Sequence, residues 1–330
     1  MSTFIFTKTL LRPFLSLVCA VLLIDAAGAQ SYPTKPIRWY VPSAASGAFD
    51  NATRALAPVL SIQMGQPLIV ENRGGSAGVA GMEQAARAAP DGYTLLTAGG
   101  SQMVFNKYFY PKLPYDPTKD FAPITLIADL PIALWVHASV PVRSLKELVS
   151  YAKANPGKLN YGSAGVGHVF HLAVELFSQQ AGIELTHVPY KGIAPASLEF
   201  VAGRIQLLFS ASTGPIMSNA KAGKIFPLVG GVAERMRAIP EVPNFVELGY
   251  NNMDAPNWIG LLAPAGLPPE LVGRWNRETV KALTAPEVAK FYDAQSYVAV
   301  SNSPEQFGRQ LAKEHATWGP IIKKLGITLE

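Results

Sequence analysis

Apolar residues along the chain follow two different spacings. Residues 37–41 (IRWYV) form a short and mostly apolar run, which predicts a buried strand. In residues 51–64 the apolar residues recur at every third or fourth position, which predicts a helix. Gly65 suits the C-terminal cap of this helix, and Pro58 should kink it.

The same change of spacing recurs further along the chain. Ser144 with Glu147 three residues later is a capping box that predicts the start of a helix, and Ser303-Pro304 with Gln306 predicts the start of the last helix. Alternation of strands and helices favours an α/β fold with mostly parallel sheets covered by helices. The other elements expected are strands at 67–71, 93–97 and 159–162, and helices at 78–89, 145–154 and 169–181.

Two segments interrupt this alternation. Residues 121–137 and 257–263 are long, extended and apolar, with prolines at their margins. We interpret each as a crossing between two domains. The first domain then consists of residues 30–127 plus 257–330 and is discontinuous in sequence, whereas the second consists of residues 128–256.

The first 29 residues are typical of a secretory signal peptide. Lys8 and Arg12 precede a short apolar run at 14–24, which is followed by Ala27-Gly28-Ala29. We expect export to the periplasm with cleavage near Ala29; the alternative is a retained membrane anchor. Cys19 is the only cysteine of the chain, so the mature protein would have no disulfide and no thiolate ligand for a metal.

Composition indicates a globular protein without a nucleic-acid footprint. Hydrophobic residues make up 49% of the chain and charged residues 15%, and the net charge is +5. The lysines and arginines are not clustered, so this charge favours solubility rather than binding to nucleic acid.

Two segments of small residues stand where a strand is followed by a helix. These are VPSAASGAFD at 41–50 and, as a partial echo, NYGSAGVGHVFH at 160–171. A helix N-terminus presents unpaired backbone N–H groups, and small residues allow an anion to reach them. Ligands of open α/β sheets bind beyond the carboxyl ends of the strands. We therefore expect the two segments to face each other across a cleft that holds a carboxylate or phosphate.

These small-residue segments could also serve packing rather than ligand binding. Tight packing of a helix on a strand requires small residues as well. Asp50 could cap the first helix, or it could contact an ammonium or hydroxyl group of a ligand. Phe49, Tyr190, Phe209 and Trp258 could line a pocket or belong to the core.

Two kinds of enzyme site are also conceivable. GGSAG at 74–78 matches the G-x-S-x-G nucleophile elbow of serine hydrolases, with Ser76 as the nucleophile and His315 available as the base. His168, His171 and Glu175 would share one helix face and could hold a metal, although the HExxH spacing is absent.

Many short motifs follow one another in a specific order and spacing after the signal segment. These are YPTKPIRWYVP (32–42), GQPLIVENRGGSAG (65–78), APDGYTLL (89–96), KLPYDPTKDFAPI (112–124), NPGKLNYGSAG (155–165), HVPYKG (187–192), AGKI (222–225), IPEVPNFVELGY (239–250) and WIGLLAPAGLP (258–268). On these motifs the mature chain resembles the periplasmic solute receptors of tripartite tricarboxylate transporters, the Bug-type binding proteins. The resemblance covers nearly everything after the signal segment.

This resemblance implies a two-lobed periplasmic binding protein of the Venus-flytrap type II, with mixed β-sheets covered by helices. It implies a monomer without cofactor or metal that closes on a small organic acid and delivers it to membrane transporter subunits. The carboxylate would be held by backbone N–H groups of residues 43–50 and 163–168. It also implies that GGSAG is a glycine-rich turn without a catalytic serine.

The chain departs from the family pattern at two places. Ser46 stands where the first glycine of Gly-Gly-x-x-Asp is usual, and Ser43-Ala44-Ala45 stands in place of an aromatic residue and prolines, whereas Asp50 is kept. Ser210-Ala211-Ser212 stands where an Asp-Asn-type pair is common. These differences argue against transferring a preference for an amino acid or a polycarboxylate. A sensor that signals to a partner is a further alternative. The ligand-binding residues that we expect are Ser46, Gly47, Ala48, Phe49, Asp50, Ser101, Gln102, Ser163, Ala164, Gly165, His168 and Trp258.

Overall fold

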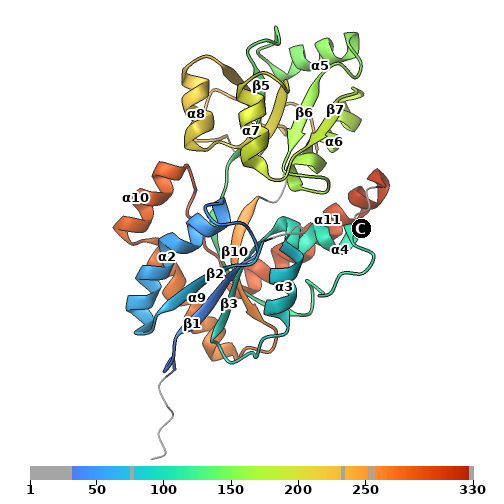
Figure 1. Cartoon of the computed structure of the whole chain (residues 1–330). Coiled ribbons are helices and arrows are strands. Elements are labelled where there is room, and N and C mark those ends of the chain that lie inside the picture. The colour runs from blue at the N-terminus through green and yellow to red at the C-terminus, as the bar shows by residue number, and fades with distance from the viewer. Residues whose placement is uncertain (1–31, 75–77, 232–234, 252, 254–256, 327–330) are drawn as a thin grey trace, which may run out of the picture.

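The computed structural model describes residues 32–74, 78–231, 235–251, 253 and 257–326. These residues form two lobes, each built around one five-stranded mixed sheet (Figure 1). The expected class, two lobes with mixed sheets covered by helices, is confirmed. The signal peptide predicted at residues 1–29 lies outside the described residues.

The first sheet has the strand order β2-β1-β3-β10-β4. Strand β1 pairs in parallel with β2 and β3, whereas β10 pairs antiparallel with β3 and β4. Every residue of β10 is buried, which fits a strand between two neighbours in the middle of a covered sheet. The strands are β1 (Ile37–Val41), β2 (Leu68–Asn72), β3 (Thr94–Gly99), β4 (Phe121–Asp129) and β10 (Trp258–Pro264).

The second sheet repeats this arrangement with the order β7-β6-β8-β5-β9. Here β6 pairs in parallel with β7 and β8, and β5 pairs antiparallel with β8 and β9. Strand β6 therefore occupies the position that β1 has in the first sheet. The strands are β5 (Ile132–His137), β6 (Asn160–Ser163), β7 (Thr186–Pro189), β8 (Leu207–Ala211) and β9 (Ile225–Gly230).

Helices cover both sheets, and the C-terminal helices return to the first lobe. Helices α9 and α11 pack on β4, and α10 packs on α2. In the described part of the chain, no helix combines the length and the apolar character needed to cross a membrane. The helices are α2 (Ala48–Met64), α3 (Val79–Ala86), the π-helix η2 (Ser101–Phe105), α4 (Asn106–Phe109), α5 (Leu145–Ala154), α6 (Val169–Ala181), α7 (Ile193–Val201), α8 (Gly214–Lys221), α9 (Pro269–Leu283), α10 (Pro286–Gln295) and α11 (Pro304–Leu325).

The chain passes between the sheets at two neighbouring places. Residues 121–137 are two strands rather than one extended run, because β4 ends in the first sheet and β5 begins in the second. The return leads from β9 to β10. The two passages are hydrogen-bonded to each other, since Leu130 N–H donates to the Asn257 carbonyl (3.2 Å) and Asn257 Nδ2 donates to the Leu130 carbonyl (2.7 Å).

Several predicted boundaries are confirmed and others are wrong. Helices α5 and α6 have the predicted bounds, and Gly65 caps α2 in the left-handed conformation. Helix α2 begins three residues earlier than expected, and it remains one helix across Pro58. The early start places Asp50 in the first turn of the helix, where an acidic side chain is favourable.

The contribution of the α11 capping box to stability can be measured directly. Ser303 Oγ accepts from Gln306 N–H (3.2 Å), and Ser303 N–H donates to Gln306 Oε1 (2.8 Å). We expect Ser303→Ala to lower the free energy of unfolding by about 1 kcal/mol, the usual cost of losing such a cap. Urea unfolding measures the change. Ser301→Ala, at an exposed position just before the helix, is the control and should change the free energy by less than about 0.5 kcal/mol.

Candidate ligand-binding site

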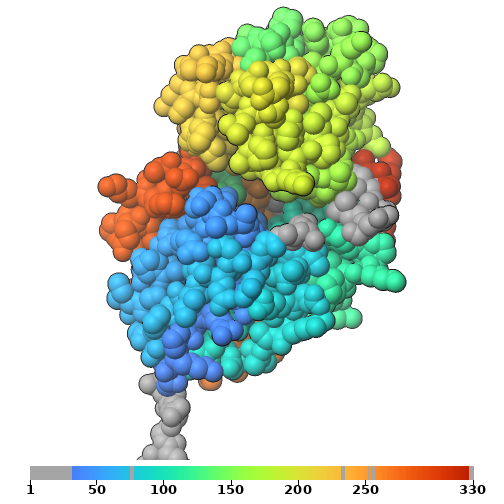
Figure 2. Space-filling model, viewed as in Figure 1, coloured from blue at the N-terminus to red at the C-terminus, as the bar shows by residue number. Residues whose placement is uncertain are grey.

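Two loops follow equivalent strands in the two lobes. The first loop (residues 42–47) connects β1 to α2, and the second loop (residues 164–168) connects β6 to α6. Both strands lie between two parallel neighbours, so both loops leave the sheet at the carboxyl end where such folds bind ligands. Figure 1 shows the start of α2 on the side of its lobe that faces the other lobe, and Figure 2 shows a hollow between the lobes above this blue segment.

The start of α2 has free backbone donors. Its N-cap is Gly47, which has no side chain to accept a hydrogen bond. Within the described residues, the N–H groups of Ala48 and Phe49 have no acceptor, whereas Gly47 N–H makes a long bond to the Ala44 carbonyl (3.4 Å). Ala48, Phe49 and Asp50 belong to the first helical turn rather than to the loop. The helix N-terminus therefore presents the unpaired donors and partial positive charge that suit an anion.

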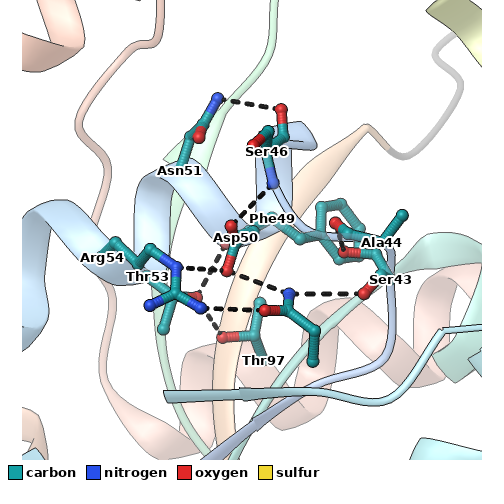
Figure 3. Close-up of polar contacts among 10 residues, drawn as sticks. Ser43, Ala44, Ser46, Phe49, Asp50, Asn51, Thr53, Arg54 and Thr97 are labelled. Atoms are coloured by element: carbon teal, nitrogen blue, oxygen red, sulfur yellow. Dashed lines mark hydrogen bonds and ion pairs between the residues drawn. The ribbon is translucent and has the colours of Figure 1, made fainter. Parts of the chain in front are cut away.

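Asp50 holds the first loop in place (Figure 3). Its carboxylate is buried, with 2% of the residue exposed. Oδ2 accepts from Ser46 N–H (2.8 Å), and Oδ1 accepts from Arg54 Nε (2.7 Å) and Asn72 Nδ2 (2.9 Å). Three donors from the loop, the helix and β2 thus converge on one carboxylate. Asp50 therefore braces the loop rather than capping the helix, because its carboxylate accepts from Ser46 in the loop and from no backbone N–H of the first turn of α2.

These contacts also keep Asp50 ionised. Burial by itself would raise the pKa of this carboxyl, but the hydrogen bonds from Ser46 and Asn72 and the charge of Arg54 outweigh burial and lower the pKa below its ordinary value. The loop conformation needs this anchor because Ser46 has a φ of 62°, in the left-handed region that non-glycine residues rarely adopt.

The sequence analysis missed Arg54 and Asn72. Arg54 lies one helical turn after Asp50, a spacing at which ion pairs form on helices, so the pattern alone could have indicated it. Asn72 is the last residue of β2 and is paired with Val41, the last residue of β1. It could have been found only after the order of the strands was known.

Phe49 and Trp258 pack into the first lobe. A Cβ atom added at Gly99 would lie 2.5 Å from Phe49 Cζ, so the Phe49 ring occupies the space that this glycine leaves on β3. Trp258 is buried, stacks edge to face with Phe307 (5.2 Å between centroids), and its indole N–H donates to Glu314. Trp258 therefore belongs to the core, whereas Phe49 is partly buried and packs against it.

Ser101 and Gln102 begin the π-helix that follows β3, the strand next to β1. Gln102 Oε1 accepts from Gly99 N–H (3.2 Å). A Cβ at Gly78 would lie 2.7 Å from the Pro42 carbonyl oxygen and 3.1 Å from Gln102 Nε2. The Gln102 amide and the start of the first loop therefore come together at Gly78. Single π-helical turns are frequent at functional sites, and this one lies beside the first loop.

The second loop is folded around Ser163. The buried Ser163 hydroxyl accepts from Gly165 N–H (3.1 Å) and contacts the Gly165 carbonyl (3.0 Å). His168 is the N-cap of α6, and its Nδ1 accepts from Phe170 N–H (3.3 Å). Among the described residues, the N–H groups of Ala164 and Val166 have no acceptor. Of the expected backbone donors here, Ala164 is free and Gly165 is engaged by Ser163.

The structure bears differently on the two enzyme alternatives. Ser76 lies outside the described residues, whereas His315 Nδ1 contacts the Tyr108 hydroxyl (3.2 Å) on the C-terminal helix. His171 Nδ1 accepts from Gly167 N–H (3.1 Å), and His168 caps its own helix. Nδ1 of His171 and Nδ1 of His168 thus already accept hydrogen bonds from the backbone.

Two lobes joined by two crossings, with equivalent small-residue loops at the carboxyl ends of their sheets, define the class of two-lobed solute-binding proteins. Residues 52–327 match the family described as "Tripartite tricarboxylate transporter family receptor". The chain belongs to this family, as the sequence resemblance predicted.

Known proteins of this family are similar over most of their length. Protein BugT of Bordetella pertussis is 30% identical over 303 residues, which cover 92% of this chain and 93% of BugT. The structure of the periplasmic binding protein BugD superposes with a TM-score of 0.78 at 28% identity, covering 91% of this chain and 100% of BugD. The structure of R. palustris Rpa4515 with adipate gives a TM-score of 0.80 at 32% identity, covering 90% and 99% of the two chains.

Proposed function

We propose that this protein is a periplasmic receptor that captures a small organic carboxylate between its two lobes and delivers it to a tripartite transporter in the membrane. The observation that carries the proposal is the set of free backbone N–H groups, at Ala48 and Phe49 in one lobe and at Ala164 and Val166 in the other. Donors of this kind fit a carboxylate without any side-chain charge. The adipate in the related R. palustris structure supports an acid of similar size.

The proposed mechanism is closure of the two lobes. One carboxylate oxygen would accept from the first turn of α2 and another from the second loop, so the ligand would connect the lobes. Such a ligand favours the closed state only to the extent that it binds this state more tightly than the open one. The hinge would lie at the paired crossings near Leu130 and Asn257. The proposed lobes are residues 30–127 with 257–330, and residues 128–256.

The proposal includes export and excludes chemistry on the ligand. Residues 1–29 would direct the protein to the periplasm and be removed near Ala29. Relatives of known structure are periplasmic binding proteins, which supports this location. A receptor of this kind needs no cofactor, and we propose that it acts as a monomer. Ser76→Ala should accordingly leave ligand affinity unchanged, and model esters should not be hydrolysed.

A thermal-shift screen of the mature protein tests the proposal. We expect a saturable rise in melting temperature with one or more mono- or dicarboxylates, adipate among them, because a ligand that binds only the folded state stabilises it. At a concentration 100 times its Kd the ligand should add about 2.7 kcal/mol to the free energy of unfolding. The neutral amide of the same acid is the matched control and should give no shift. An equal shift with acid and amide would contradict the carboxylate site.

A further inference from the structure

Three aromatic rings stack next to the second loop. They come from three elements: Tyr161 from β6, His171 from α6 and His187 from β7. The centroids of His171 and His187 are 4.0 Å apart with planes inclined by 16°, and those of Tyr161 and His187 are 4.8 Å apart with planes inclined by 20°. Stacking of this kind fixes the orientation of each ring, and so determines where its nitrogen atoms point.

Each histidine of this stack is hydrogen-bonded to the second loop or to the residue before it. His171 Nδ1 accepts directly from Gly167 N–H (3.1 Å). His187 Nε2 lies 2.7 Å from Ser163 Oγ, and this oxygen accepts from Gly165 N–H. The two rings therefore fix two alternate residues of the loop, and Val166 stands between them. Val166 is exposed, and its N–H is one of the free donors.

We infer that His171 and His187 are positioning residues for ligand binding, which hold the second loop so that its free N–H groups are oriented toward the ligand. This inference rests on the proposed function only in assigning the second loop to the ligand. The role differs from a contact, because neither histidine needs to touch the acid. It also differs from a metal site, because His171 Nδ1 is already an acceptor for the backbone.

The arrangement requires a neutral His171 ring. An unprotonated His171 Nδ1 accepts the Gly167 N–H, so the ring proton is on Nε2, which lies 4.0 Å from Glu175 Oε1 on the next turn of α6. Glu175 Oε1 also accepts a hydrogen bond from the Tyr161 hydroxyl. The remaining titratable neighbours are His168 on α6 and His187 on β7. A proton on His171 Nδ1 would set two donors against each other and would release Gly167.

Burial keeps the rings neutral at physiological pH. It lowers the pKa of His171 to about 4, and burial together with the neighbouring His171 lowers the pKa of His187 to about 4. In the unfolded chain both groups would have the ordinary histidine pKa near 6.5. The unfolded state therefore binds more protons between pH 6.5 and 4, so stability falls as the pH is lowered through this window.

Amide hydrogen exchange on the full mature protein, without ligand, tests the inference. His171→Leu removes the acceptor, so we expect Gly167 N–H to exchange about tenfold faster, in line with the loss of one hydrogen bond. His171→Asn is the matched control, because its Oδ1 can replace Nδ1 as the acceptor, and it should keep exchange within about twofold of the wild type. Equal exchange of Gly167 in His171→Leu and the wild type would overturn the inference.

A second measurement, on the wild-type protein, tests the inference even if His171→Leu does not fold. In an NMR pH titration, the Gly167 amide resonance should shift with the same midpoint as the His171 ring, at about pH 4. Long-range ¹H–¹⁵N spectra should show the neutral His171 ring proton on Nε2. A Gly167 resonance that does not respond to His171, or a proton on Nδ1, would overturn the inference.

Calorimetry with adipate as the probe connects the loop to binding. We expect His171→Leu to weaken adipate binding about tenfold and His171→Asn to keep the wild-type affinity within about twofold. Full affinity in a folded His171→Leu protein would overturn the positioning role. A wild type that binds no acid would instead refute the proposed function, while the exchange and titration results would still show whether His171 holds the loop.

Discussion

Gly47→Val should strongly weaken ligand binding while the protein remains folded. Gly47 has φ −78° and ψ 170°, an extended conformation that valine readily adopts. A Cβ at this position would lie 3.3 Å from the Ala44 carbonyl oxygen, which requires only a small shift of the exposed loop. The isopropyl group would, however, stand beside the N–H groups of Ala48 and Phe49. We expect an affinity loss of about 100-fold, equivalent to about 2.7 kcal/mol.

Titration calorimetry with the acid that gives the largest thermal shift measures this loss. Gly47→Ala is the matched control, because it adds the Cβ alone, and its effect should lie between those of glycine and valine. Urea unfolding should show a change of less than about 1 kcal/mol for Gly47→Val. Wild-type affinity in the folded Gly47→Val protein would mean that the ligand does not bind at the start of α2.

Asp50→Ala should destabilise the first lobe and weaken binding together. The substitution leaves Ser46 N–H, Asn72 Nδ2 and the Arg54 guanidinium without their shared acceptor. Two of these donors are partly buried, and an unpaired buried donor costs roughly 1–3 kcal/mol. Arg54 is about half exposed, so water replaces part of what it loses. We expect the free energy of unfolding to fall by about 3 kcal/mol.

The pH dependence of the stability lost in Asp50→Ala tests whether the ionised carboxylate is what stabilises the first lobe. The folded pKa of Asp50 lies below its ordinary value, so its contribution is complete above that ordinary value. The contribution is lost as the pH falls through the lowered pKa. The difference between the wild type and Asp50→Ala in urea unfolding should therefore be largest near pH 7 and should shrink in acid. Arg54→Gln, which removes one exposed partner, is the control, with an expected cost of less than about 1 kcal/mol. If Asp50→Ala lowered the free energy of unfolding no more than Arg54→Gln, the proposed role of Asp50 in holding the first loop would be contradicted.

The sequence was sufficient to predict the elements that depend on local patterns. The helices at residues 145–154 and 169–181 were predicted with their observed bounds, because capping residues and apolar spacing are local signals. The two small-residue loops were also found, since a strand, a run of small side chains and a helix follow one another directly. The same signals placed residues 121–137 at a crossing, although they did not reveal the break into two strands.

The parts that the sequence could not predict depend on contacts between distant segments. Asn72 reaches Asp50 only because β2 lies beside β1 in the sheet. His187 meets Ser163 and His171 only because β7 pairs with β6. Each of these requires the order of the strands, which no local pattern contains.

The place of β10 in the first sheet also sets the order in which a newly made chain can complete its lobes. Strands β3 and β4 are not neighbours, and β10 joins them. A chain that emerges from its N-terminus has every strand of the second sheet once Gly230 has appeared, whereas β4 has no partner until residues 258–264 follow. The second lobe can therefore finish first. A chain truncated before Trp258 would keep β4 as an unpaired apolar strand, the kind of segment that aggregates.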